Sequence, residues 1–181
     1  MPLLLWPVHI VFLELIIDPA CSVIFEAERA EKNVMSRPPK SVDEPFFGIN
    51  KILLSCSQGI SVLISTLAVF FVGQYLGYND GAVRAMSFVT LIASNIAIIL
   101  SNRSWSESIF KILATPNKTV KWVVGGAGFF LTLILNMPFL RDLFQFEVIS
   151  FIEAIICLVI GFVTITWFEL YKKWSRAWNT V

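Results

Sequence analysis

The chain has 181 residues, of which 56 % are hydrophobic and only 15 % charged, and its formal net charge is +1. Soluble domains carry about 25 % charged residues, so this composition excludes an ordinary soluble domain, a disordered chain and a coiled coil. The near-zero charge also argues against a nucleic-acid partner, and we expect the lipid bilayer as the surroundings of the chain. The sequence therefore predicts an all-α membrane protein.

Five apolar segments approach the length of about 20 residues that a helix needs to cross a bilayer core about 30 Å thick. They cover residues 3–25, 52–73, 86–100, 120–137 and 149–168. The third is short, and it starts as early as Ala82 if the Arg84 side chain reaches the head groups. We expect one domain over residues 1–181, with cytosolic loops at residues 26–51 and 101–119.

The lysines and arginines are concentrated in alternate connections of this topology. Five lie in the loop after the first segment, four in the loop after the third and three in the tail, whereas the other two connections contain only Arg84 and Arg141. Cytosolic loops are enriched in basic residues. We therefore predict an amino terminus outside the cell or in a lumen, and a carboxyl terminus in the cytosol.

Two acidic residues, Glu14 and Asp18, lie inside the first apolar segment. At a rise of 1.5 Å per residue they are roughly 16 and 22 Å from Leu3, at the depth of the hydrocarbon layer. A charged side chain there costs about 2.5–3.5 kcal/mol, so both need compensating partners. They are four residues apart and share one helix face. Pro19 lacks an amide donor and clashes with the Leu15 carbonyl, so we expect the helix to unwind near Asp18-Pro19.

This acidic pair has three interpretations. Two carboxylates beside freed carbonyl groups make an oxygen-rich site that suits a hard cation such as Ca²⁺. Alternatively, one carboxyl group binds a proton, because burial and a like-charged neighbour both disfavour the charged form. In the third interpretation the two acids bond only to each other or to neighbouring helices. Acids inside a membrane are usually functional, so the pair indicates an ion or proton pathway.

The residues around the pair resemble a known family. The run Leu-Trp-Pro-Val-His-Ile-Val-Phe-Leu-Glu-Leu-Ile-Ile-Asp-Pro from Leu5 to Pro19 resembles the sixth transmembrane helix of P-type cation-transporting ATPases, in particular the calcium-pump-like branch. The run Met-Ser-Arg-Pro-Pro-Lys at residues 35–40 is similar to the segment between helices six and seven of those pumps. The number of spans, their orientation and the position of the acids agree with helices six to ten of the family.

The resemblance implies that Glu14 and Asp18 correspond to ion ligands of the sixth helix, with Asp18 the closer match. On the counterpart of the eighth helix, the Glu of two-site calcium pumps is absent, and Ser94 and Asn95 are weaker ligand candidates. A single ion site is therefore implied. Ca²⁺ is the favoured cation, with Mn²⁺, Na⁺ and H⁺ as alternatives.

The printed residues contain no Asp-Lys-Thr-Gly-Thr phosphorylation motif and no nucleotide-binding domain. The resemblance implies that ATP and Mg²⁺ are handled by the missing amino-terminal half of a pump, which is the expected partner. We expect no ATP hydrolysis by this chain alone. Two functions stay open: a carboxyl-terminal fragment that contributes to the ion site of an ATP-driven pump, and a stand-alone, non-enzymatic membrane module that modulates an intact pump or has no function of its own.

Three further features carry predictions. His9, one turn from the acidic pair, is expected to be a packed or interfacial histidine rather than an ion gate. Gly125, Gly126 and Gly128 are expected to permit close helix approach. Glu153, near the outer end of the last segment, is expected to bond to a neighbouring helix or to be hydrated at the interface.

Overall fold

A computed structural model describes residues 3–27, 49–103 and 118–171, with the side chains of Asp18, Ala20, Asn50, Lys51 and Lys118 left out. Five of its helices are long and apolar enough to cross a membrane. The described part of the chain contains no β-strand. These observations confirm the predicted all-α class with five candidate spans.

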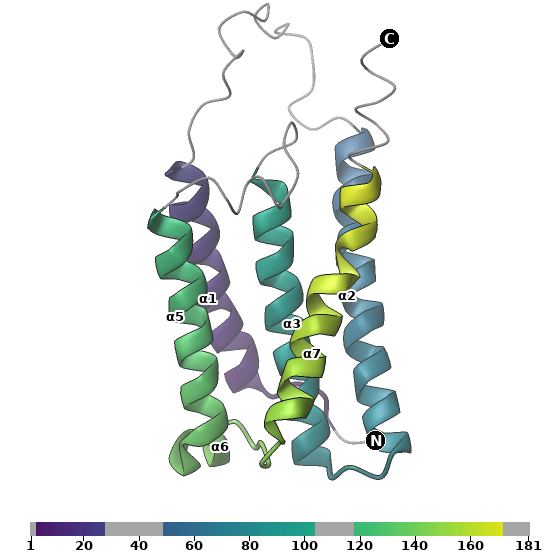
Figure 1. Ribbon diagram of the computed structural model, residues 1–181, viewed down its shortest axis with the longest axis vertical. Coiled ribbons are helices and arrows are strands. Elements are labelled where there is room, and N and C mark those ends of the chain that lie inside the picture. Colours follow the sequence, from purple (N-terminus) through teal and green to yellow (C-terminus); the bar gives the residue numbers. More distant parts are fainter. Residues whose placement is uncertain (1–2, 28–48, 104–117, 172–181) are drawn as a thin grey trace, which may run out of the picture.

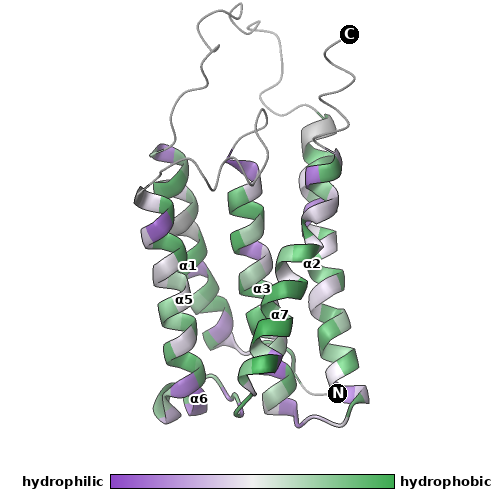
Figure 2. Ribbon diagram, in the orientation of Figure 1, coloured by the Kyte–Doolittle hydropathy of each residue, from purple (hydrophilic) through white to green (hydrophobic). Residues whose placement is uncertain are grey.

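The helices run side by side as a bundle (Figure 1). Their bounds are α1 (Pro7–Glu26), α2 (Ile49–Tyr75), α3 (Asp80–Asn102), α5 (Lys118–Asn136), the short α6 (Pro138–Leu143) and α7 (Phe151–Thr164). The last apolar span continues past a turn at Ile165 and covers Phe151–Tyr171. Figure 2 shows apolar residues along the lengths of the helices and hydrophilic residues mostly toward their ends.

Helix α3 is the centre of the bundle and contacts α1, α2, α5 and α7. In its most apolar window 72 % of the residues are buried, compared with 12–22 % in the other four spans. Small residues on several sides of α3, among them Ala85, Ala93 and Ala97, are completely or almost completely buried. Their size lets neighbouring helices approach from more than one direction.

Helices α3 and α7 approach each other closely at Gly161. A Cβ atom at Gly161 would lie 2.5 Å from the Ala93 Cβ, 2.8 Å from the Thr90 carbonyl oxygen and 2.9 Å from the Ser94 amide nitrogen. A contact this close is possible only without a side chain. By contrast, a Cβ atom at Gly125, Gly126 or Gly128 of α5 would meet nothing within 4 Å, so the predicted packing role of these three glycines is wrong within the described part of the chain.

Helix α1 is unbroken from Pro7 to Glu26 and includes Pro19 in its interior, which corrects the expected unwinding near Asp18-Pro19. A proline removes one amide donor and crowds one carbonyl group, here that of Leu15. Both Leu15 and Pro19 lie on the exposed face of α1, where no other described helix packs against the ring. Local adjustment therefore accommodates the proline, as transmembrane helices commonly do.

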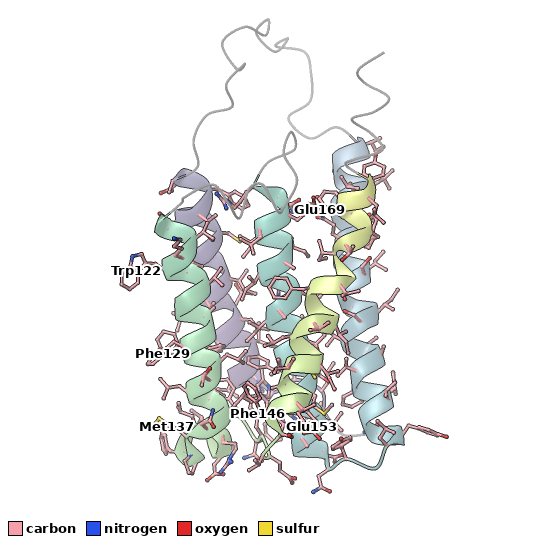
Figure 3. The ribbon with its side chains drawn as sticks, in the orientation of Figure 1. Trp122, Phe129, Met137, Phe146, Glu153 and Glu169 are labelled. Atoms are coloured by element: carbon pink, nitrogen blue, oxygen red, sulfur yellow. The ribbon has the colours of Figure 1, made fainter. Side chains whose placement is uncertain are left out.

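Hydrogen bonds between polar side chains join neighbouring helices near the carboxyl-terminal end of α3. The Ser101 hydroxyl donates to the Glu169 carboxylate at 2.6 Å, and the amide groups of Gln58 and Asn102 donate to each other at 3.3 Å. Glu169 and Glu153 lie at opposite ends of the last span (Figure 3). The hydrogen bonds at the Glu169 end thus tie α2, α3 and the last span together.

Candidate functional site

The exposed face of α1 carries the first predicted ligand, Glu14. Its neighbours along this face are apolar and exposed: Val11 is 65 % and Leu15 is 70 % exposed. Glu14 is itself exposed, although it lies in the middle of a helix apolar enough to cross a membrane. An acid beside exposed apolar side chains in the middle of such a helix is costly in hydrocarbon unless a partner compensates its charge.

Asp18 follows Glu14 by four residues in the unbroken helix, so its backbone position is on the same face. The side chain of Asp18 is outside the described part of the structure. Among the described residues there is no group of three or more His, Cys, Asp or Glu side chains that could hold a metal ion. Glu14 therefore belongs to no such group among the described side chains.

The two weaker candidates, Ser94 and Asn95, point in different directions from α3. Ser94 is completely buried where α3 meets Gly161 of α7, and its hydroxyl has no hydrogen-bond partner among the described residues. Asn95 lines a small cavity of about 20 Å³ between α1, α3 and α5, together with Leu13 and Ile17. Because Leu13 and Glu14 are about 100° apart around the helix, the structure brings Asn95 to α1 but not to the Glu14 face.

His9 is buried in a cluster of aromatic rings at the start of α1. Its ring centroid lies 5.2 Å from Phe88, 5.4 Å from Phe144 and 5.0 Å from Phe146. The Trp6 amide donates to Nδ1 at 2.7 Å, so Nε2 carries the proton and donates to the Phe144 carbonyl oxygen at 2.9 Å. Both ring nitrogens are satisfied by backbone groups, which confirms the interpretation of His9 as a packed histidine.

Arg84 forms a second contact at the same end of α1, and this contact was not predicted from the sequence. Its side chain is only 8 % exposed. The Nε atom donates to the Leu3 carbonyl oxygen at 3.1 Å, and Nη1 donates to the Gln145 carbonyl oxygen at 2.6 Å. The guanidinium carbon also lies 6.0 Å from the centre of the Trp6 ring. Arg84 therefore joins the segment before α1 to the connection between α6 and α7.

The backbone of the connection between α6 and α7 places a carbonyl group within hydrogen-bond distance of Arg84. Gln145 has a φ of 53°, and the Phe146 amide donates back to the Arg141 carbonyl oxygen at 2.9 Å. This left-handed residue after the last turn of α6 reverses the chain and leaves the Gln145 carbonyl available to Arg84. One sequence signal for this anchor exists: Arg84 is a cation at the edge of an apolar segment and needs carbonyl or acidic partners.

The comparisons with known proteins agree with this architecture. A family model described as "Cation transporting ATPase, C-terminus" matches residues 2–174. The chain belongs to this family. The match covers the whole described bundle, including α1 with Glu14 and Asp18.

The curated relatives that match this chain are named calcium-transporting ATPases. Calcium-transporting ATPase 1 of Lactococcus lactis is 29 % identical over 139 residues, which is 76 % of this chain and 15 % of that protein. Calcium-transporting ATPase type 2C member 1 of Homo sapiens is 25 % identical over 171 residues, 93 % of this chain and 18 % of that protein. The chain thus spans less than a fifth of the length of these relatives, and it is similar to their carboxyl-terminal membrane region.

The match places the exposed face of α1 in a region that makes up only 15–18 % of the length of these relatives. The buried sides of α1 contact α3 and α5, whereas the side with Glu14 is exposed.

Proposed function

We propose that this chain is the carboxyl-terminal membrane part of an ATP-driven calcium pump, in which Glu14 and Asp18 are ligands of the transported cation. The observation that carries the proposal is the exposure of Glu14 at mid-helix on the uncovered face of α1. A carboxylate facing hydrocarbon costs about 2.5–3.5 kcal/mol. A cation and further oxygen ligands from the rest of the pump would offset this cost.

The chemistry of the two acids fits Ca²⁺, which prefers six to eight oxygen ligands. The relatives are named calcium-transporting ATPases, which favours Ca²⁺ over Mn²⁺, Na⁺ or H⁺. In the complete pump, ATP and Mg²⁺ would act on domains outside this chain. Phosphorylation there would shift the site between a state that binds the cation tightly and a state that releases it across the membrane, and α1 would contribute ligands to both states.

The proposal includes an orientation for the bundle. The end of the bundle with Arg84, Gln145 and the start of α1 would face the outside or lumen, because the basic residues are concentrated in the other connections. A Val148→Cys variant should react with an impermeant thiol reagent applied to that side of sealed vesicles. Reaction from the cytosolic side alone would reverse the orientation.

The ion-site assignment is tested in a chimera in which residues 2–174 replace the matching region of the Lactococcus lactis pump. Calcium-dependent phosphoenzyme formation would be measured for the parent chimera and for Glu14→Gln, Asp18→Asn and the control Glu26→Gln at the exposed end of α1. We expect the calcium concentration at half-maximum to rise about tenfold or more in the first two variants, since each removes a charged ligand. Unchanged calcium dependence in both would remove the assignment and favour a non-enzymatic module.

A further inference from the structure

A cavity of about 440 Å³ lies between α2 and α7, away from the proposed ion site. Its volume is within the range of about 300–1,000 Å³ typical of small-molecule sites. Most of the lining is apolar, with Val69 and Val72 of α2, Met86 of α3, and Ile156 and Ile160 of α7. Val72 and Ile156 are about half exposed, so the cavity opens toward the surroundings of the bundle.

One end of this cavity is polar, because Glu153 and Tyr78 line it. Glu153 lies in the first turn of α7, at the end of the bundle opposite Glu169 (Figure 3). From Glu153 to Ile160 the lining continues for about 10 Å along α7, at a rise of 1.5 Å per residue. The cavity is therefore amphipathic along its length, with an acid at the end of the helix and apolar residues deeper in the bundle.

The described partners of Glu153 are neutral groups. The Ser150 amide donates to Oε2 at 2.6 Å, and the Tyr78 hydroxyl lies close enough to the same carboxyl group to raise the pKa of Tyr78. A carboxylate accepts about four hydrogen bonds. The polar end of the cavity thus offers an acid with acceptor sites that its partners in the described part of the chain leave open, and these complement a cation with N–H donors.

We propose that this cavity binds an amphiphile with a primary ammonium head group, which pairs with Glu153 while its apolar chain lies between α2 and α7. A primary ammonium group has three donors and matches the carboxylate and the phenol oxygen. A trimethylammonium group carries the same charge but no donor, and a hydroxyl head group has a donor but no charge. The shared chemistry can come from a free long-chain amine or from a phospholipid with a primary ammonium head group.

The test uses the full 181-residue chain in nanodiscs of trimethylammonium phospholipids. Three photoreactive probes share one alkyl chain and differ in the head group, which is primary ammonium, trimethylammonium or hydroxyl. Mass spectrometry maps the labelled peptides. We expect the ammonium probe to label the lining of α2 and α7 about tenfold more than the others, the effect of one charge-assisted hydrogen bond. Equal labelling by all three probes would overturn the proposal, since the cavity would then hold only an acyl chain.

Labelling of the same peptides in variants tests which residues bind the ammonium head group. Glu153→Gln removes the charge and keeps a side chain that supports the capping box at Ser150. Labelling by the ammonium probe should fall about tenfold in this variant and in Ala68→Phe, which adds a large side chain to the lining of the cavity. It should be unchanged in Glu147→Gln, a carboxylate on the preceding loop that bonds to Asn79 instead. Full labelling of Glu153→Gln would overturn the assignment to this acid.

A competition distinguishes the two sources of the head group. Phospholipids with a primary ammonium head group are added to the nanodiscs before labelling. Loss of the signal identifies the membrane lipid as an occupant, whereas persistence identifies the single-chain amine as the preferred one, and both results support the site. Because the head-group comparison uses the unmodified chain, it does not depend on how any variant folds.

Discussion

Helices α3 and α1 have nearly equal mean hydropathy, 1.9 and 2.0, yet 72 % of the apolar window of α3 is buried compared with 12 % of that of α1. Hydropathy reports that both helices suit a bilayer. It does not report how many sides of a helix have protein neighbours. The difference between the two helices lies in side-chain size, since buried alanines and serines of α3 admit neighbours on several sides.

The two regions also differ in how they are held in the bundle. The most extensive contacts of the described bundle join α2, α3 and α7, which we call the closed unit, and α3 also contacts α1 and α5. Helix α1 is held at its start by buried His9 and Arg84, while its middle presents Glu14 outward. The start of α1 is thus fixed by buried polar contacts, whereas its middle is exposed at Glu14.

The largest predicted effect breaks the closed unit. Gly161→Leu should lower the free energy of unfolding by about 3 kcal/mol, and Gly161→Ala by somewhat less, because any side chain there overlaps Ala93 and the backbone of α3. Unfolding in mixed micelles, followed by circular dichroism, measures the change. The matched control is Gly125→Ala on α5, where the added methyl group meets nothing. Equal stability of Gly161→Ala and the control would mean that α3 and α7 are not in close contact.

A smaller effect is expected where the two regions are joined. Arg84→Met should cost about 2 kcal/mol, because the Leu3 and Gln145 carbonyl groups lose their donor. The change should concentrate in α1, so amide hydrogen exchange should speed up in its first turns and stay constant in α3 and α7. Arg141→Met, at the same end of the bundle, serves as the control. Uniform acceleration over all helices would show that Arg84 supports the whole bundle rather than the start of α1.

Much of this fold was predictable, because a run of apolar residues specifies a helix in lipid without reference to the rest of the chain. The anchor at Arg84 was not, since its two acceptors lie 81 and 61 residues away in the sequence. The glycines show the same limit: a cluster at residues 125–128 drew attention, but the single Gly161 makes the close contact. Local patterns indicate that a helix exists, and only the tertiary arrangement decides which face meets a neighbour.

The candidate site shows this limit most clearly. Depth and spacing singled out Glu14 and Asp18, because an acid inside an apolar segment is anomalous from the sequence alone. The same reasoning could not separate Ser94 from Asn95, which are adjacent in sequence. Ser94 is buried against α7, whereas Asn95 lies beside α1 and α5. Adjacent residues of a helix differ by about 100° in direction, so their roles depend on neighbours that the sequence does not name.

The smallest predicted effect concerns Tyr78, at the polar end of the closed unit. The hydrogen bond to the Glu153 carboxylate, and then its negative charge, raise the pKa of Tyr78 above the ordinary value of 10.0. A raised pKa means that the folded chain favours the neutral phenol, so this contribution to stability is complete below about pH 10 and is lost as the pH rises through the pKa of Tyr78. Absorbance of the phenolate measures the titration, and subtraction of a Tyr78→Phe variant isolates this tyrosine. In Glu153→Gln the pKa should fall toward its ordinary value, and a titration unaffected by this change would place the Glu153 charge away from the phenol and weaken the polar end of the cavity.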